Sequence, residues 1–178
     1  MRRRRRQYGL YVSMLRFMIQ IERPMIHVLF LCLGNICRSP MAEAVFKKMV
    51  DDEGLSGVIS VDSAGTGSWH VGEKAHRGTR RVLSQYGIAY DGRARQIAEK
   101  DVQGNTYIVA MSRENVDEFR RRFGDNYPQL HRLLDFVPDG EARDVPDPYY
   151  TGNFEYVYQL VDEGCRGLLA YIRQQEQL

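Results

Sequence analysis

A short apolar run that leads straight into a loop and a helix start constrains the fold of this chain more than any other segment. Residues 27–31 (His-Val-Leu-Phe-Leu) have the near-continuous apolar character of a strand buried in a parallel sheet. A loop over residues 32–38 follows, and Ser39 with Pro40 then predicts a helix, with the serine as its N-cap and the proline at its first position. The segment therefore predicts a parallel α/β sheet with a helix N-terminus just beyond its first strand.

The same loop carries groups that can bind and attack a phosphate. Unpaired backbone N–H groups at a helix N-terminus favour an anion, and Gly34 lets the backbone come close to it. Arg38 adds a planar fork of donors that can hold two phosphate oxygens. These positive surroundings favour the nucleophilic thiolate form of Cys32. We therefore expect the Cys32 sulfur to attack the phosphorus of a bound phosphate, forming a cysteinyl-phosphate and expelling an alcohol.

Strands and helices alternate along the rest of the chain. We expect strands over residues 27–32, 58–63, 106–111 and 132–134, and helices over residues 40–52, 74–86, 96–100, 113–122 and 153–174. This alternation predicts an α/β three-layer sandwich, a four-stranded parallel sheet with helices on both faces. Sites in such sheets lie at the carboxyl ends of the strands, where Cys32, Ser63, Ser112 and the loop of Asp147 all fall.

The composition fits one enzyme domain over residues 25–178. Three cysteines do not make a disulfide scaffold, and no stretch is long and apolar enough to span a bilayer. We expect a cytoplasmic protein that needs no metal and no cofactor, is a monomer or weak dimer, and has no nucleic-acid or membrane partner for its core.

Residues 1–24 differ from the rest of the chain. They contain seven arginines and one glutamate, a formal charge of +6, so residues 25–178 sum to −4 within the chain's +2. An arginine run before an apolar patch is similar to a signal peptide, but Arg16 interrupts the patch and no small-residue cleavage site follows. We expect either a translation start placed too early or a disordered basic extension; an arm for nucleic acid or acidic lipid is a further alternative.

The segment Val28–Glu43 resembles the signature of the low-molecular-weight protein tyrosine phosphatases. The resemblance continues through three further motifs, Asp62–Thr66 with Trp69, Arg93–Ile97 and Val145–Tyr150, and so covers residues 25–178. It implies the strand order 2-1-3-4. It also implies hydrolysis of protein phosphotyrosine, and of small aryl phosphates, through a cysteinyl-phosphate.

Expulsion of an alkoxide or phenolate requires a proton donor, and a carboxylic acid on a loop above the site is a usual one. Asp147 is the candidate, because Pro146 and Pro148 fix the backbone on both sides of it. The resemblance implies that Asp147 is the general acid and later the base that activates water. A turn aspartate that caps its own backbone is the alternative interpretation.

The resemblance also assigns supporting roles around the nucleophile. Asn35 is expected to brace the loop, the Ser39 hydroxyl to donate to the Cys32 sulfur, and Ser63 to support the loop through hydrogen bonds. The other members of the phosphate-binding loop are Leu33, Gly34, Ile36 and Cys37. The plainer interpretation of Asn35 is a turn residue and of Ser39 a helix cap, and both interpretations can hold together.

Aromatic side chains are expected to form the walls of the substrate pocket, because a phosphotyrosine ring requires apolar surfaces around a deep slot. Trp69, Tyr149 and Tyr150 are the candidates. Ile36 favours phosphotyrosine, since the related arginine phosphatases carry a threonine at that place. A protein arginine phosphatase remains the alternative function. An arsenate reductase is less favoured, because such enzymes need a further pair of redox cysteines and only Cys165 follows the loop. A phosphate-binding or redox-sensing module without turnover is also less favoured, because it has no use for a proton donor such as Asp147.

Three features of the loop's surroundings add expectations. Cys37 is expected to protect Cys32 by forming a reversible disulfide with it, although a small buried hydrophobic residue is the alternative. Some members of the family carry a histidine where this chain has Gly92, so one member of the supporting network is expected to be missing. Many members carry an aspartate where this chain has Ser112, which is expected to change rates without abolishing activity.

Overall fold

The computed structural model describes residues 24–104, 106–138 and 144–178, which form a four-stranded parallel sheet in the order β2-β1-β3-β4. The strands are β1 (Ile26–Cys32), β2 (Ile59–Gly65), β3 (Thr106–Ala110) and β4 (Leu130–Arg132). The predicted fold class and strand order are therefore confirmed.

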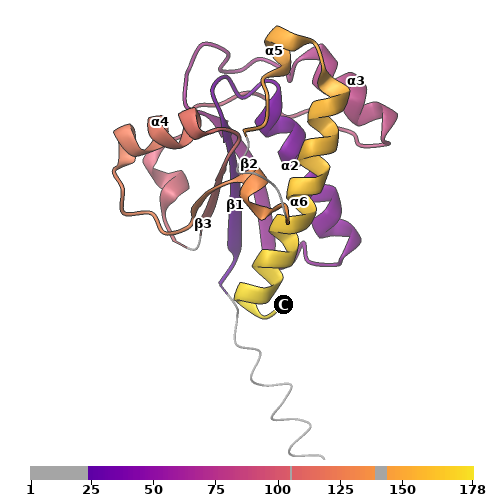
Figure 1. Cartoon of the computed structure of the whole chain (residues 1–178). Coiled ribbons are helices and arrows are strands. Elements are labelled where there is room, and N and C mark those ends of the chain that lie inside the picture. The colour runs from indigo at the N-terminus through magenta and orange to yellow at the C-terminus, as the bar shows by residue number, and fades with distance from the viewer. Residues whose placement is uncertain (1–23, 105, 139–143) are drawn as a thin grey trace, which may run out of the picture.

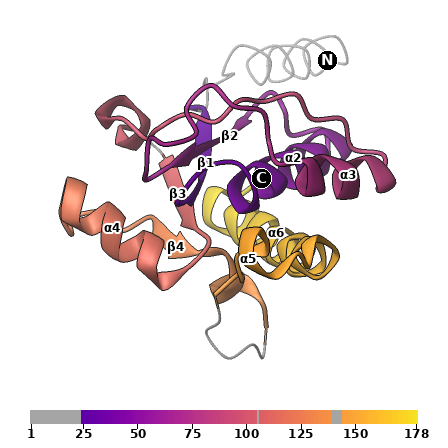
Figure 2. The ribbon, with the colours of Figure 1, turned by 90° about the horizontal axis from the view of Figure 1, so that it is seen from above.

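Helices cover both faces of this sheet (Figures 1 and 2). The α-helices are α2 (Arg38–Asp52), α3 (Arg77–Gln85), α4 (Arg113–Phe123), α5 (Pro148–Thr151) and α6 (Phe154–Glu176), and the 3₁₀ turns are η1 (Glu99–Val102) and η2 (Leu133–Phe136). Figure 2 shows α4 on one side of the strands and α2, α3 and α6 on the other. Every helix among the described residues is too short or too polar to cross a bilayer.

The central strand β1 explains why two layers of helices are needed. Its side chains alternate between the two faces, so Val28 and Phe30 enter the core under α2 and α6, whereas Leu29 and Leu31 enter the smaller core under α4. Phe30 packs edge-on against Phe46 of α2, with the ring centroids 5.6 Å apart. A strand that is apolar on both faces must be covered on both, which fixes its central place in the sheet.

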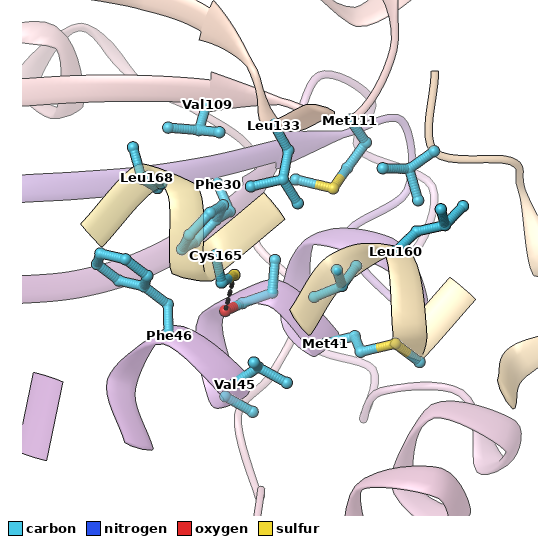
Figure 3. Close-up of a cluster of buried hydrophobic side chains, with 14 of the residues drawn as sticks. Phe30, Met41, Val45, Phe46, Val109, Met111, Leu133, Leu160, Cys165 and Leu168 are labelled. Atoms are coloured by element: carbon cyan, nitrogen blue, oxygen red, sulfur yellow. Dashed lines mark hydrogen bonds between the residues drawn. The ribbon is translucent and has the colours of Figure 1, made fainter. Parts of the chain in front are cut away.

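Helix α6 closes the larger core along the full height of the sheet. Figure 3 shows its Leu160, Cys165 and Leu168 among the side chains of β1, β3 and α2. The Cys165 thiol is fully buried, its burial raises the pKa well above the ordinary value, and it lies 3.8 Å from the Ala42 carbonyl oxygen. Cys165 is therefore a packed core thiol, as its place in the last helix predicts.

Several element bounds differ from the sequence-based expectations. The last strand ends at Arg132, and residues 133–136 form η2 in place of the strand predicted over 132–134. Helix α2 begins at Arg38, with Cys37 as an N-cap that makes no side-chain hydrogen bond. The prediction that Ser39 caps this helix was therefore wrong, and its hydroxyl is free to act elsewhere. Of the basic extension predicted over residues 1–24, all but Pro24 lies outside the described residues.

Candidate functional site

A pocket of about 310 Å³ lies at the carboxyl end of β1. Three segments that are far apart in the sequence supply its walls: the loop between β1 and α2, the loop after β2, and the start of α5. The lining residues are Cys32, Leu33, Gly34, Ile36, Cys37, Arg38, Trp69, His70, Asp147, Tyr149 and Tyr150. All of them except His70 were predicted from the sequence.

Cys32 lines this pocket and is buried, with 2% of the residue exposed. The backbone N–H of Asn35 donates to its sulfur at 3.2 Å, and the Ser39 hydroxyl lies 3.0 Å away. Asn35 has a φ of 54°, a left-handed conformation that turns its N–H back toward the sulfur. Both contacts stabilise negative charge on sulfur, because each can place a polar hydrogen beside it.

Arg38 connects this loop to the segment before α5. Its Nη2 donates to Asp147 Oδ2 at 2.5 Å and its Nη1 to the Val145 carbonyl at 3.4 Å. The third nitrogen, Nε, is buried without a hydrogen-bond partner among the described residues. A buried donor without a partner costs about 1–3 kcal/mol, which an anion in the pocket would remove. The guanidinium is therefore built to receive an anion.

Asp147 caps a helix turn, as one of its two interpretations predicted, and it also lines the pocket. Its Oδ1 accepts a hydrogen bond from the Tyr149 backbone N–H at 3.1 Å, so it is the N-cap of α5. Its other oxygen, Oδ2, faces Arg38 inside the pocket. The cap and the two flanking prolines hold the carboxyl in the lining of the pocket, with one oxygen on Arg38.

A chain of buried hydrogen bonds runs outward from the loop. The Asn35 amide donates from Nδ2 to Ser39 Oγ at 2.9 Å and to Ser63 Oγ at 2.8 Å, while its Oδ1 accepts from the Arg95 backbone N–H. Ser63 in turn donates to the carboxylate of Glu43 at 2.6 Å. The structure thus brings together the three predicted supporting residues and adds Glu43.

The direction of these bonds follows from Glu43 at the outer end and from the Asn35 amide, whose nitrogen can only donate. An ionised Glu43 can only accept, so Ser63 must donate to it and must itself accept from Asn35. Ser39 also accepts from Asn35, which leaves its own hydrogen for the Cys32 sulfur. Burial raises the pKa of Glu43, whereas the hydrogen bonds from Ser63 and Tyr90 oppose that rise.

Tyr90 joins the same network at Glu43. Its hydroxyl donates to Glu43 at 2.8 Å, and burial raises the pKa of this phenol far above its ordinary value. A Cβ atom on residue 92 would lie 2.3 Å from the Tyr90 hydroxyl oxygen, so Gly92 is the residue that makes room for this phenol. Gly92 thus leaves room for Tyr90, which adds a contact at the Glu43 end of the network.

His70 was not predicted, although its neighbour Trp69 was. Its Nδ1 lies 3.0 Å from Glu73 Oε2, and its ring covers Gly34, where an added Cβ would lie 2.9 Å from His70 Cδ2. The loop glycine is thus required by the ring above it. The pattern Trp-His-x-x-Glu in a loop was the only sequence signal for this residue.

The remaining residues predicted from the sequence differ in their exposure to solvent and in whether they line the pocket. The aromatic walls are open to solvent, with Trp69 72%, Tyr149 55% and Tyr150 82% exposed. Cys37 is buried, and burial raises the pKa of its thiol to about 12. Ser112 does not line the pocket: it is the N-cap of α4 and accepts from the Asn115 backbone N–H at 3.3 Å.

A larger cavity, of about 440 Å³, lies between α2 and α6. Its charged residues are paired with one another, for example Lys48 with Asp52 and Arg166 with Asp162, and no cysteine lines it. The smaller pocket is therefore the candidate site because of the reactive side chains that line it, although the other cavity is larger.

Comparison with known proteins gives a consistent result. The family model described as low molecular weight phosphotyrosine protein phosphatase matches residues 27–178. The low molecular weight protein-tyrosine-phosphatase YfkJ of Bacillus subtilis is 53% identical over 156 residues, which cover 86% of this chain and all of that protein.

Solved structures agree with these sequence matches. The crystal structure of YfkJ aligns with a TM-score of 0.82 at 52% identity, covering 85% of this chain and 96% of that one. The crystal structure of a Drosophila arginine phosphatase aligns with a TM-score of 0.75 at 32% identity, covering 82% and 97% of the two chains.

Proposed function

Since the chain belongs to the low molecular weight phosphotyrosine protein phosphatase family, we propose that it hydrolyses phosphotyrosine in proteins, and small aryl phosphates, through a cysteinyl-phosphate. One observation supports this proposal most: a cysteine sulfur, an arginine fork and a carboxyl gather in one pocket, with Arg38 and Asp147 in contact across 109 positions of sequence. Binding alone would not require the carboxyl.

In the first step, the Cys32 thiolate attacks phosphorus and the bond from phosphorus to the phenolic oxygen breaks. Arg38 turns its fork to two phosphate oxygens, satisfying the buried Nε, while the loop N–H groups hold the third. Asp147, acting as the general acid, gives a proton to the departing oxygen, so that tyrosine leaves as a neutral phenol.

In the second step, a water molecule attacks phosphorus through its oxygen, and the Asp147 carboxylate accepts a proton from that water. The bond from sulfur to phosphorus breaks, inorganic phosphate leaves and the thiolate is regenerated. The Ser39 hydroxyl, 3.0 Å from the sulfur, stabilises the charge that returns to it.

Aromatic walls support the choice of an aryl phosphate. Trp69 and Tyr149 flank the pocket, and Ile36 gives its floor an apolar, branched side chain. A phosphotyrosine ring between such walls buries apolar surface that phosphoserine lacks. Phosphoarginine remains a second candidate because the arginine phosphatase of Drosophila shares the fold.

A side-by-side assay with phosphotyrosine, phosphoserine and phosphoarginine peptides tests the proposal. We expect hydrolysis of phosphotyrosine, loss of turnover in Cys32→Ser, and a fall in kcat of about 10²–10⁴-fold in Asp147→Asn. The Asp147→Asn loss should be smaller for p-nitrophenyl phosphate, whose leaving group needs no proton. Wild-type turnover in Cys32→Ser would refute the mechanism. Faster hydrolysis of the phosphoarginine peptide than of the phosphotyrosine peptide would make phosphoarginine the proposed substrate instead.

A further inference from the structure

One edge of the pocket continues into a strongly basic surface, which we call the α3 rim. It consists of the exposed side chains of Lys74, Arg77, Arg80, Arg81 and Arg93. Residues 69–93 carry these five cations and two acidic residues, a formal charge of +3, although residues 25–178 together sum to −4. The rim is therefore a locally positive segment within a domain of net negative charge.

The chain itself connects the rim to the pocket. Residues 69–70 form a wall of the pocket. The segment that follows them pairs with residues 92–94 through the backbone: Gly72 N–H donates to the Ala94 carbonyl at 2.8 Å, and Lys74 and Arg93 form an isolated antiparallel β-bridge. The rim therefore begins within a few residues of the wall.

The start of α3 contacts the pocket a second time. The His76 N–H donates to the Ile36 carbonyl in the phosphate loop at 2.7 Å, and the His76 ring lies 6.0 Å from that of Tyr149. Figure 1 shows α3 and α5 at the same end of the molecule. Arg77 is the next residue after His76, so its helix turn borders the slot.

Two of the guanidinium groups are held in place on this border. Arg80 Nε donates to the Ala75 carbonyl at 3.0 Å, and Arg93 Nη1 donates to the Gly72 carbonyl at 2.8 Å. A guanidinium has five N–H donors, and each of these two uses one in the described structure. The others are available to an anion without the cost of ordering a free side chain.

The rim is not neutralised by the protein itself. Within the part of the chain that the structure describes, none of its five cations forms an ion pair, although Arg120, Arg166 and Arg173 elsewhere do. Arg77 lies three and four positions before Arg80 and Arg81, a spacing at which like charges on a helix repel one another. After burial, which is the larger cause, Arg77 and Arg80 lower the pKa of the neighbouring His76.

We propose that the α3 rim binds an acidic segment of the substrate protein next to its phosphotyrosine. The proposal rests on the proposed function, because a polypeptide whose phosphotyrosine enters the slot must cross one of the slot's edges. An extended peptide advances about 3.3 Å per residue, so acidic residues roughly two to five positions from the phosphotyrosine reach the rim. Recognition of this kind acts on substrate choice and encounter rate more than on the chemical step.

Phosphotyrosine peptides that differ only in their flanks test this inference. Three glutamates are placed before or after the phosphotyrosine, and three glutamines at the same positions give the neutral reference. We expect kcat/KM for the better acidic peptide to exceed that for its neutral partner on the order of tenfold at low salt, mainly through KM, and the ratio to approach one at about 0.5 M NaCl.

Two triple variants assign the effect to the rim. Arg77→Gln with Arg80→Gln and Arg81→Gln should bring the ratio of acidic to neutral peptide close to one. The same charge change on α4, Arg120→Gln with Arg121→Gln and Arg122→Gln, should leave the ratio as in the wild type. Each ratio is internal to one protein, so a general loss of activity does not imitate the effect.

The outcomes separate this inference from the proposed function. A wild type that hydrolyses free phosphotyrosine but shows no preference for acidic flanks overturns the inference alone, as does a rim variant that keeps the preference. An equal loss in both variants would reduce the effect to net charge and also overturn it. A wild type that hydrolyses no phosphotyrosine overturns the proposed function instead.

Discussion

Tyr90 is the outermost residue of a hydrogen-bonded chain that ends at the Cys32 sulfur. It contacts neither the pocket nor the sulfur, yet it donates to Glu43, whose charge makes Ser63 the donor in the bond between them. A protonated Glu43 could donate to Ser63, whose own hydrogen would then lose its acceptor and whose support of Asn35 would weaken. Tyr90 is in this sense a positioning residue for the nucleophile.

Tyr90→Phe should therefore change the pH dependence of the enzyme. The hydroxyl opposes the effect of burial on Glu43, so its removal raises the Glu43 pKa further, and the acidic limb of kcat should move to higher pH. At neutral pH we expect a fall in kcat of about two- to tenfold, the value of one net hydrogen bond. Steady-state rates from pH 4 to 8, on the order of ten points, measure both effects.

Tyr86→Phe is the matched control, since Tyr86 donates to a surface carboxylate, Glu155, that is not part of the hydrogen-bonded chain. Its pH profile should coincide with that of the wild type. An unchanged acidic limb in Tyr90→Phe would show that Glu43 is held ionised without the phenol.

At the scale of elements, the contact between α6 and η2 depends on helix residues without side chains. Gly164 and Gly167 face η2, and a Cβ on Gly167 would lie 2.0 Å from the Phe136 carbonyl oxygen. Replacing glycine by alanine within a helix ordinarily gains about 1 kcal/mol. Here a backbone atom blocks the added carbon, so the strain outweighs the gain.

Gly167→Ala should lower the free energy of unfolding by about 1–3 kcal/mol, the usual cost of overpacking. Urea unfolding measures the change. Gly57→Ala is the control because nothing lies within 4 Å of its added Cβ, and it should stay within about 0.5 kcal/mol of the wild type. Equal stability of the two variants would mean that η2 moves aside at no cost.

Elements whose apolar pattern runs without interruption could be predicted from the sequence, and short ones could not. The strand that ends in Cys32 and the helix that contains Cys165 lie where their patterns indicate. Helix α5 was missed because it is held by the Asp147 cap rather than by an apolar face, and β4 was shifted because residues 133–136 are apolar but turn. Periodicity reports burial, and these two segments depend on local hydrogen bonds.

The candidate site divides in a similar way. Its reactive residues lie in compact motifs, so Cys32, Arg38 and Asp147 could be predicted together. Glu43 and Tyr90 could not, because their role depends on a contact across 47 positions that only the fold creates. The room that Gly92 leaves for a neighbouring phenol is equally invisible in a linear pattern.

At the scale of the whole molecule, the pocket, both cores and the sheet all lie within residues 26–178. We therefore propose that residues 25–178 are a complete phosphatase domain. A chain that begins at Met25 should hydrolyse p-nitrophenyl phosphate with a kcat within about twofold of the full chain and unfold at the same urea concentration. A loss of stability on truncation would show that residues 1–24 contribute to the fold.

Helix α6 also determines when the pocket can exist. It is the last helix in the described order, and it covers the same face of the sheet as α2. Its Phe154 stacks on His76, next to the pocket, at a centroid distance of 4.9 Å. During synthesis Cys32 emerges well before the helix that closes its core. A nascent chain therefore carries Cys32 and its loop without the closed core that shapes the pocket around them until residues 154–176 have left the ribosome.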